Sequence, residues 1–519
     1  MPEPPRPPRP PRPSGPTGST GASGPTGPAV ASTASPRAAA TARAAGPDAH
    51  RVLAAIAAGE LAARAPVAVP PQATIRAAAQ RMRDERVSSV LLVDDDGALR
   101  GLVTDRDLRG RVVACGLDVG LPASRIATAE PLTIEAHASA FDALVLMARH
   151  GVHHLPVMRD GRAVGLLTAG DLSRRRDRST LALADAIRRH GTLEALARES
   201  AGVGALQVEL AAAGTTAHAT GQLVTAVSDA LAIRLLQLAE ARLGPPPVPY
   251  AWAAAGSQAR GEQTARSDQD NCLVLDDAYE PQRHGAYFEA LARGVCDGLD
   301  ACGYVHCPGG MMAMTDAWRQ PLRRWIACFD EWIGEPDPTA LMLTSVFFDL
   351  RAVAGDARLV AALRARVLER ARTGELFLAA LLRNALQHRP ALGLLGRLDW
   401  SRGAGGRGID LKHAGTVPIV DLARVDALAA GRDAVGTTER LAGAGPHGWL
   451  SEADARDLRG AFEFIASMRI RHQAGCIERD VPADNRVRPD ELSRFERSQL
   501  RDAFAVVQTV QQVFAQRRG

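Results

Sequence analysis

Residues 250–275 read YAWAAAGSQARGEQTARSDQDNCLVL, and the fold of the central part of the chain is best predicted from this segment. It begins with an apolar segment that leads into Gly256 and Ser257, continues with a polar segment of helix length, and ends with a second apolar segment. Asp268 and Asp270 stand at the head of that second segment. Because side chains alternate along a strand, we expect both carboxylates to point to the same side. Two converging carboxylates are suitable ligands for a Mg²⁺ ion that holds a triphosphate.

Gly256 and Ser257 predict the phosphate-binding half of the same site. A glycine lets the backbone approach a ligand closely, and Ser257 would begin a helix whose free N–H groups and dipole favour phosphate. The alternative is that Asp268 and Asp270 only cap a turn, which is the usual role of an isolated Asp-x-Asp sequence. The Gly-Ser pair upstream and an Asp-bearing apolar segment downstream favour the nucleotide site.

This combination, Gly-Ser followed by Asp-x-Asp, resembles the signature of the polymerase-β-like nucleotidyltransferase superfamily. Within it, Gly-Ser-x-x-Arg-Gly-Glu-Gln followed by Ser-Asp-Gln-Asp-Asn is most similar to nucleotidyltransferases related to the bacterial PII-protein uridylyltransferase. The resemblance implies metal-dependent attack of an acceptor hydroxyl on the α-phosphate of a nucleoside triphosphate, with Mg²⁺ or Mn²⁺ as the metal. It also implies a uridylyl-like donated group and a protein acceptor.

The same resemblance assigns roles to individual residues. Such enzymes use a third carboxylate from a neighbouring strand, and the candidate here is Asp349 in the apolar and aromatic segment 345–351. Arg260 and Arg266 are cations of the kind that neutralises triphosphate charge. Catalysis and metal binding are then expected at Asp268, Asp270 and Asp349, and nucleotide binding at Gly256, Ser257, Arg260 and Glu262.

Length and composition predict a soluble protein of several domains. The chain has 519 residues, which is too long for a single core. Apolar residues make up 46% and charged residues 23%, as in globular proteins. The net charge of +4 and the single lysine, Lys412, give no electrostatic case for nucleic acid as a partner. We find no apolar run of about 18 residues that would predict a membrane span.

The seven cysteines are scattered and include no Cys-x-x-Cys pair, which fits a reducing compartment and predicts a cytoplasmic protein. Cys296, Cys302, His306 and Cys307 lie close together in the sequence, and zinc binding is one interpretation of them. Their spacing matches no standard zinc pattern, so buried or loop thiols are the favoured interpretation.

Residues 1–47 form a segment rich in Pro, Gly, Ser, Thr and Ala with repeated Pro-Pro-Arg. Such a segment cannot bury enough apolar surface to offset the entropy of ordering, which predicts a disordered, partly polyproline tail. A docking role of Pro-Pro-Arg for a partner is the alternative. We expect no catalytic residue in it.

An internal repeat occupies residues 48–178, in which segment 82–108 is similar to segment 147–172. Each copy predicts a helix, a strand, an Asp/Gly hairpin, a strand and then Thr-x-x-Asp at the start of another helix. The repeat resembles a tandem pair of cystathionine-β-synthase-type (CBS) domains, at about 66–110 and 126–176.

In the CBS family the Gly-x-x-Thr-x-x-Asp motif can bind an adenosine nucleotide, with the Thr on phosphate and the Asp on ribose hydroxyls. The resemblance therefore implies AMP, ADP or ATP as an effector, bound at Thr104 with Asp107 and at Thr168 with Asp171. It also implies a homodimer formed through the CBS pair. The alternative is that both Thr-x-x-Asp sets are only helix caps.

The remaining segments complete the mixed α/β architecture. Residues 179–205 predict a helical connector, and residues 206–369 predict the nucleotidyltransferase domain, a sheet covered by helices. Residues 374–519 predict a helical bundle. This last region is similar to the substrate-binding-type domain that accompanies such nucleotidyltransferases.

Four polar residues of the C-terminal region, Lys412, Arg469, Arg471 and His472, are candidates for a second half of the site. Arg469 and His472 are three residues apart and are expected to share one face of a helix. Two interpretations stay open. One is a phosphate- or acceptor-facing patch, and the other is an ion-paired helix that packs on its neighbour.

Two other functions are compatible with parts of the sequence. A non-catalytic, adenylate-sensing regulator would retain the fold, but intact Asp268, Asp270 and Asp349 count against it. A tRNA or antibiotic nucleotidyltransferase is disfavoured because aromatic residues make up only 4% of the chain and no basic, aromatic-rich strip is evident.

Overall fold

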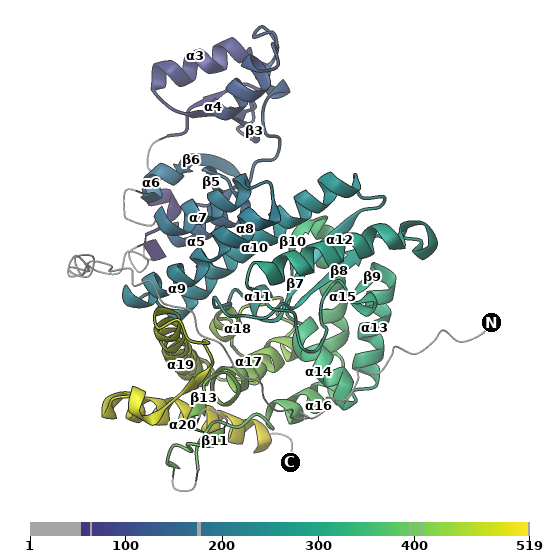
Figure 1. Ribbon diagram of the computed structural model, residues 1–519. Coiled ribbons are helices and arrows are strands. Elements are labelled where there is room, and N and C mark those ends of the chain that lie inside the picture. Colours follow the sequence, from purple (N-terminus) through teal and green to yellow (C-terminus); the bar gives the residue numbers. More distant parts are fainter. Residues whose placement is uncertain are drawn as a thin grey trace, which may run out of the picture.

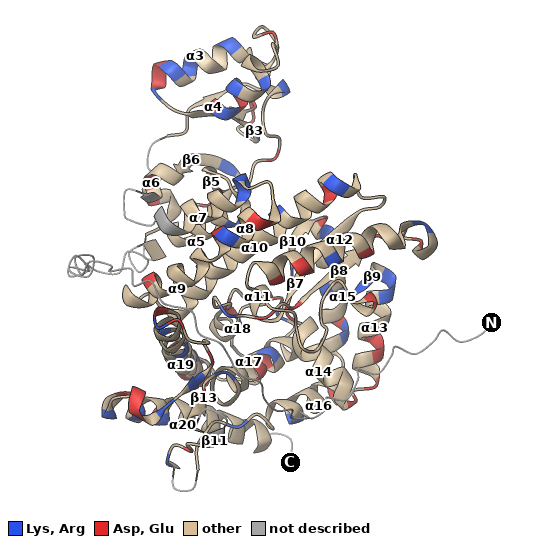
Figure 2. Cartoon of the chain, in the orientation of Figure 1, with Lys and Arg blue, Asp and Glu red and all other residues tan. Residues whose placement is uncertain are grey.

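The computed structural model describes residues 53–516 apart from 55, 63–64, 174–177, 394–395 and 404–405. The predicted tail and its Pro-Pro-Arg sequences, at residues 1–47, lie outside the described residues. In Figure 1 the first repeat lies at one end of the molecule, and the C-terminal helices lie at the other. The central sheet lies between them, and basic and acidic residues are interspersed over all of these parts (Figure 2).

The two predicted repeats are confirmed as two copies of one β–α–β–β unit. In each copy a short first strand pairs in parallel with the second strand, which pairs antiparallel with the third. The first copy consists of β1 (Ala68–Val69), α3 (Ile75–Glu85), β2 (Ser89–Val93) and β3 (Leu99–Thr104). The second copy consists of β4 (Ile134–Glu135), α5 (Ala140–His150), β5 (His154–Arg159) and β6 (Arg162–Thr168). Short helices flank them: α2 (Ala58–Leu61), α4 (Asp105–Asp107) and α6 (Ala169–Ser173).

The two repeats differ in what they pack against. The first has a small core of its own, built from α3 and its sheet around residues such as Met82 and Val90. The core of the second, around Leu144 and Leu155, is continuous with that of the following helices. These helices are α7 (Arg178–Arg189), α8 (Leu193–Ser200), α9 (Gly202–Ala212) and α10 (Ala217–Leu243).

Helix α10 (Ala217–Leu243) is the central helix of the molecule. Among the described residues it is the one helix that is long and apolar enough to cross a membrane, a window that the sequence analysis missed. However, 72% of this window is buried inside the protein. The second repeat, α9 and the central sheet all pack on α10, which is therefore enclosed by protein.

The central sheet has the strand order β10-β7-β8-β9, with β7 antiparallel to both neighbours and β8 parallel to β9. Its strands are β7 (Tyr250–Ala255), β8 (Asn271–Leu275), β9 (Arg319–Pro321) and β10 (Leu350–Gly355). Trp252 and Leu273 face α10 and α12 (Pro281–Ala301), whereas Ala253 and Val274 face the opposite core. Because alternate residues enter two different cores, the strands read as unbroken apolar runs.

The segment between Gly256 and Asp268 differs from the prediction of a full helix. Helix α11 (Gly256–Ala259) is only one turn long and is followed by turns and loop. Gly261 has a φ of +69°, which a right-handed helix does not tolerate. Consequently Asp268 and Asp270 lie in the loop before β8, and not on the strand itself.

Helices of the C-terminal half cover the second face of the sheet and share its core. The first three are α13 (Leu322–Gly334), α14 (Pro338–Phe347) and α15 (Ala357–Arg372). The predicted C-terminal bundle contains α16 (Glu375–Ala385), α17 (Val417–Ala429), α18 (Thr437–Ala442), α19 (Glu452–Glu478) and α20 (Arg494–Gln516). Two small antiparallel pairs join its loops: β11 (Arg402–Gly403) with β12 (Gly406–Arg407), and β13 (Ile409–Asp410) with β14 (Arg486–Val487).

Candidate functional site

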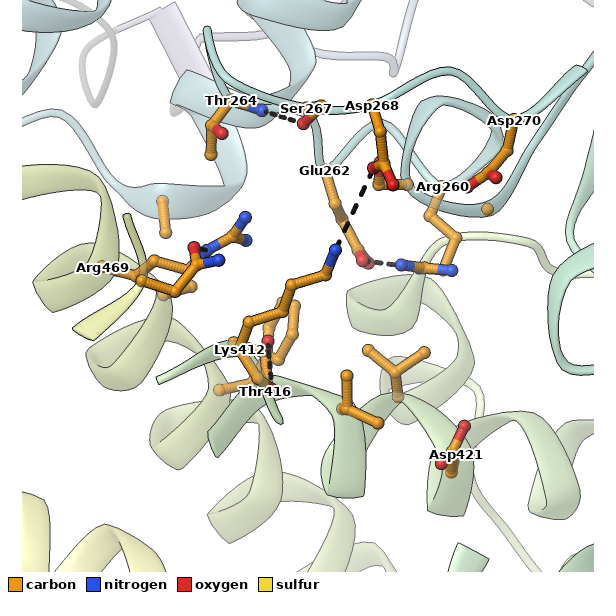
Figure 3. A pocket seen from close by; sticks show the side chains of 18 of the residues that line it. Arg260, Glu262, Thr264, Ser267, Asp268, Asp270, Lys412, Thr416, Asp421 and Arg469 are labelled. Carbon is orange, nitrogen blue, oxygen red and sulfur yellow. Dashed lines mark hydrogen bonds and ion pairs between the residues drawn. The ribbon is translucent and has the colours of Figure 1, made fainter. Parts of the chain in front are cut away.

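A cavity of about 270 Å³ lies between the central sheet and the C-terminal helices. One wall is the α11 turn with the loop that leads to β8, and it includes Gly256, Ser257, Asp268 and Asp270. The opposite wall comes from α17, α19, the segment before α17 and Asn485 after α19 (Figure 3). Residues more than a hundred positions apart in sequence therefore line one site. We call it the interdomain cavity.

Gly256 is required by the close approach of Asp270. Its φ is +54°, and a Cβ atom added there would lie 2.7 Å from Oδ2 of Asp270. A side chain at this position would push the carboxylate out of place, because carbon and oxygen atoms do not approach so closely. The glycine of the Gly-Ser pair thus makes room for a carboxylate of the Asp-x-Asp pair.

Asp268 and Asp270 both line the interdomain cavity, as the sequence analysis expected. The Asp268 side chain is 32% exposed. Burial, reinforced by the neighbouring charge of Asp268, raises the pKa of Asp270 to about 6. Two half-buried carboxylates that repel one another provide a suitable place for a divalent cation, which would relieve that repulsion.

Two cations from the C-terminal region line the same cavity. Lys412 reaches toward the carboxylates, with its Nζ atom 4.0 Å from Oδ1 of Asp268 (Figure 3). Arg469 of α19 donates from Nε to Oδ1 of Asn485 at 2.6 Å. Burial lowers the pKa of Arg469 to about 10, so its guanidinium is still charged at neutral pH. The cavity therefore has the Asp268 and Asp270 carboxylates on one wall, beside Arg260 and Arg266, and the cations Lys412 and Arg469 on the other.

Arg471 and His472 belong to a different surface. Arg471 pairs with Glu496 at 3.2 Å. His472 contacts Glu491 through Nδ1 at 2.9 Å and Asp484 through Nε2 at 2.8 Å. Of Arg469 and His472, only Arg469 lines the interdomain cavity. Arg469 therefore fits the interpretation of a cavity-facing patch, whereas Arg471 and His472 fit that of an ion-paired helix.

Asp349 lies just before β10 and is fully buried. It is not among the residues that line the interdomain cavity. Its carboxylate pairs with Arg260, Arg424 and Arg440, each at 2.7 Å. Burial alone would raise the pKa of this carboxyl, but the three guanidinium groups hold it far below its ordinary value. A metal role for Asp349 stays a prediction, and the contacts that are present are ion pairs.

Arg260 and Glu262 line the interdomain cavity, but both are held by protein partners. Nε of Arg260 donates to Glu262 at 2.6 Å, and the other Glu262 oxygen accepts from the backbone N–H of Thr437 at 2.9 Å. Since Thr437 begins α18, this pair ties the loop of the sheet to the C-terminal bundle. Sequence patterns gave no sign of the partners Arg424, Arg440 and Thr437.

A second cavity, of about 460 Å³, lies where the two repeats meet, and we call it the repeat cavity. Thr104 and Asp107 line it, together with the cations Arg106 and Arg109. Oγ1 of Thr104 donates to Asp107 at 2.7 Å, and this pair caps α4. The capping interpretation of the motif therefore holds in the structure, although the pair also faces a cavity.

The equivalent pair in the second repeat has the same local geometry but a different position. Oγ1 of Thr168 donates to Asp171 at 2.6 Å. Neither residue is among those that line the repeat cavity. A close backbone contact takes up the space beside this motif, because a Cβ atom on Gly165 would lie 2.5 Å from the carbonyl oxygen of Ala62.

No group of three or more His, Cys, Asp or Glu side chains that could hold a metal ion is found in the part of the chain that the structure describes. Asp268 and Asp270 are a pair. Such a pair fits Mg²⁺, which keeps several water ligands and takes the rest from one or two carboxylates and the substrate phosphates. Cys296 and Cys302 are buried thiols.

Family models match most of the described chain. The model described as "Putative nucleotidyltransferase DUF294" matches residues 202–339. The one described as "Putative nucleotidyltransferase substrate binding domain" matches 375–518. The CBS domain model matches twice, at 58–114 and 123–178.

Individual relatives match a smaller part. The CBS domain-containing protein YhcV of Bacillus subtilis is 35% identical over 105 residues, which is 20% of this chain and 74% of that protein. Hypoxic response protein 1 of Mycobacterium tuberculosis is 35% identical over 20% of this chain and 71% of its own length. A CBS domain protein from Pyrobaculum aerophilum, solved in complex with AMP, is 34% identical with a TM-score of 0.22, over 25% of this chain and 98% of that chain.

Proposed function

This chain belongs to the family of CBS-domain-containing nucleotidyltransferase-like proteins, and from that premise we propose that it transfers a nucleotidyl group from a nucleoside triphosphate to a protein hydroxyl. In this reaction the acceptor oxygen forms a bond to the α-phosphorus, and the bond to the β-phosphate oxygen breaks. Pyrophosphate leaves, and the hydroxyl proton is released to solvent. A uridylyl group is the donated group that the resemblance to the PII enzyme favours.

One observation carries this proposal: the carboxylates Asp268 and Asp270 face the cations Lys412 and Arg469 across the interdomain cavity. A triphosphate with its metal has complementary charges, since the phosphates are anionic and the metal is cationic. We propose that the carboxylates hold Mg²⁺ and that Lys412 and Arg469 contact the phosphates. When bound, Mg²⁺ would neutralise phosphate charge and make the α-phosphorus a better electrophile.

The chain's own residues would prepare the site for this substrate. Gly256 leaves space for the Asp270 carboxylate, and Ser257 presents a hydroxyl at the cavity wall. Arg260 and Glu262 hold the carboxylate loop against the C-terminal bundle. Asp349 would keep Arg260 and its neighbours in place. Such fixed positions lower the cost of reorganisation when the reaction occurs.

Binding of a Mg²⁺–triphosphate complex, measured by calorimetry on the full chain, tests this arrangement. Removing a charge-assisted contact costs about 1.5–3 kcal/mol, so Arg469→Gln should weaken binding about tenfold or more. Arg471→Gln is a matched control two residues away on the same helix, since Arg471 pairs with Glu496 outside the cavity. Equal affinities of the two variants would contradict the proposed position of the triphosphate.

We also propose that an adenosine nucleotide binds the repeat cavity at Thr104 and Asp107. In this cavity the Asp107 carboxylate can accept hydrogen bonds from ribose hydroxyls, and Arg106 and Arg109 can bind phosphate. Asp107→Asn and Asp171→Asn are matched variants, because both residues accept the same bond from a Thr three positions earlier. We expect Asp107→Asn alone to weaken AMP binding, about tenfold or more. Equal effects of the two variants would mean that the motifs act alike.

A further inference from the structure

A buried carboxylate that the proposed reaction does not use lies in the middle of α10. Asp229 is 0% exposed. Burial alone would raise the pKa of this carboxyl, but Arg351 and Arg149 hold it below its ordinary value. Asp229 is therefore a charged group enclosed by protein, and its partners determine whether that charge is tolerated.

The partners of Asp229 come from three different parts of the chain. Nε of Arg149, at the end of α5 in the second CBS domain, lies 2.8 Å from Oδ2 in an ion pair. Arg351 of β10 lies 2.9 Å from the same oxygen. Nε2 of Gln258, in α11, donates to Oδ1 at 3.0 Å. Asp229 thus connects the CBS pair, the central sheet and the turn that holds Ser257.

At one end of these contacts, Asp229 and Arg351 hold α11 in place. Gln258 directly follows Ser257, which lines the interdomain cavity. Arg351 also donates to the carbonyl oxygens of Gln258, at 3.0 Å, and of Ala259, at 3.4 Å. A one-turn helix has few hydrogen bonds of its own, so the position of this turn depends on such external contacts.

At the other end of these contacts, Arg149 is close in sequence to residues that line the repeat cavity. The segment 151–154, which begins two residues after Arg149, lines that cavity. Gly151 ends α5 with a φ of +67°, and Nε2 of His154 contacts Oγ of Ser88 in the first CBS domain at 3.0 Å. A ligand in the repeat cavity would therefore touch a segment that continues directly into Arg149.

From this geometry we infer that Arg149, a residue of the CBS pair, is a positioning residue for the phosphate-binding turn of the transfer site. It acts through Asp229, which holds Gln258 and Arg351. The ligand state of the repeat cavity is then transmitted to Gly256 and Ser257 through one ion pair. This inference rests on the proposed function, because it assigns a regulatory contact to the same transfer site.

Hydrogen exchange on the full chain without any ligand tests the positioning role. In Arg149→Gln, the amides of residues 258–262 should exchange about fivefold faster or more, which corresponds to about 1 kcal/mol. The amides of α10 and β7 should keep their protection, which shows that the fold is intact. Arg159→Gln is the control, since Arg159 is an exposed arginine of the same CBS domain. Unchanged exchange of 258–262 in Arg149→Gln would overturn the inference.

A second variant keeps the test decisive if Arg149→Gln does not fold. Removing one partner of a buried ion pair leaves the other charge uncompensated, whereas removing both charges is far less costly. The double variant Arg149→Gln, Asp229→Asn removes one cation and the carboxylate, and the remaining cation, Arg351, keeps its hydrogen bonds to the carbonyl oxygens of Gln258 and Ala259. It should therefore fold and should still show faster exchange at 258–262. Wild-type exchange in this double variant would equally overturn the inference.

Binding measurements separate this inference from the proposed function. We expect saturating AMP to change the Kd of a non-hydrolysable Mg²⁺–triphosphate about fivefold or more in the wild type and in Arg159→Gln. In the double variant the change should be less than about twofold. If the triphosphate binds but AMP leaves its Kd unchanged in the wild type, the inference is wrong and the proposed function stands. If no triphosphate binds at all, the proposed function is wrong and the inference falls with it.

Discussion

Among single residues, Gly256 is the one whose identity the site constrains most. Its positive φ and the 2.7 Å separation from Asp270 Oδ2 that a Cβ atom would have both exclude a side chain. We expect Gly256→Ala to fold and to lose transfer by about a hundredfold, because small displacements of reacting groups cost about that much. Gly285→Ala in α12 is the control, since its nearest neighbour would be the Tyr279 hydroxyl at 3.5 Å. Full activity of Gly256→Ala would contradict the account.

Asp349 provides a second prediction at this scale, because its two possible roles predict opposite results. If its ion pairs with Arg260, Arg424 and Arg440 are its role, Asp349→Asn should lower the free energy of unfolding by about 3–5 kcal/mol. If it were a metal ligand exposed to the substrate, the variant would stay stable and lose metal affinity. Denaturant unfolding and Mg²⁺ titration of the same variant distinguish the two.

The pH dependence of that difference has a defined sign. The pKa of Asp349 is lowered in the folded protein, so its contribution is fully present above the unfolded value of 3.8 and is lost as pH falls below it. The unfolding free energies of wild type and Asp349→Asn should therefore differ by a constant amount between about pH 7 and 5. A difference that shrinks already within that range would contradict the assignment.

The sequence predicted those site residues that lie near one another along the chain. The Gly-Ser pair and the Asp-x-Asp pair lie within one short segment, and the structure brings them to one cavity. The family resemblance indicates Asp349, in the apolar segment 345–351, as the third carboxylate, but its ion-pair partners Arg424 and Arg440 come from distant helices. Local sequence patterns do not predict ion pairs between residues so far apart along the chain.

At the scale of elements, α19 shows why the spacing of residues along a helix did not predict which side chains line the second wall of the interdomain cavity. Arg469 points into the interdomain cavity, whereas His472 finds Asp484 and Glu491 in the following loop. Residues three positions apart generally share one face of a helix. The contacts that their side chains make still depend on which partners the neighbouring loops place beside them. Helix α11 is also shorter than its composition predicts. Gly261 has a positive φ, which does not allow the helix to continue.

An ion pair between the turn after α16 and helix α17 gives a prediction for this scale. Nδ1 of His388 contacts Asp421 at 2.8 Å, and this hydrogen bond raises the pKa of His388 above its ordinary value of 6.5. A raised pKa means that the pair stabilises the fold fully below pH 6.5 and loses this effect as pH rises through the folded-state value. The His388 side chain is 43% exposed, so the effect should be under about 1 kcal/mol.

Nuclear magnetic resonance titration of the imidazole measures this directly. In wild type the midpoint for His388 should lie above 6.5, and in Asp421→Asn it should fall back toward that value. A His388 midpoint that does not respond to Asp421→Asn would show that the hydrogen bond is not formed in solution.

For the whole molecule, the cores do not follow the predicted domain boundaries. One face of the central sheet and the C-terminal bundle share a core that includes Val274 and Phe504. The second CBS domain shares a core with α10, whereas the first has its own. The sequence located the segments through their repeats and composition. It did not show which faces would be buried together, because the central strands β7 and β8 are apolar on both faces.

These cores predict how the molecule unfolds. The central sheet and the C-terminal bundle should unfold together, while the first CBS domain, with its small core, should open at lower denaturant. Hydrogen exchange measured over a denaturant series would show β7 and α19 losing protection at one midpoint and β2 at a lower one. Separate midpoints for β7 and α19 would contradict a shared core.

The central claim is that the carboxylate pair in the interdomain cavity supports nucleotidyl transfer to a protein. The most direct measurement offers each α-labelled nucleoside triphosphate, with Mg²⁺ or Mn²⁺, to a lysate of the source cell. Wild-type protein is compared with Asp270→Asn, in which loss of a metal-binding carboxylate should reduce transfer by several orders of magnitude. We predict a labelled protein band that requires the wild-type carboxylate, strongest with UTP. Label confined to RNA or small molecules, equal labelling by Asp270→Asn, or no labelling with any triphosphate would contradict the account.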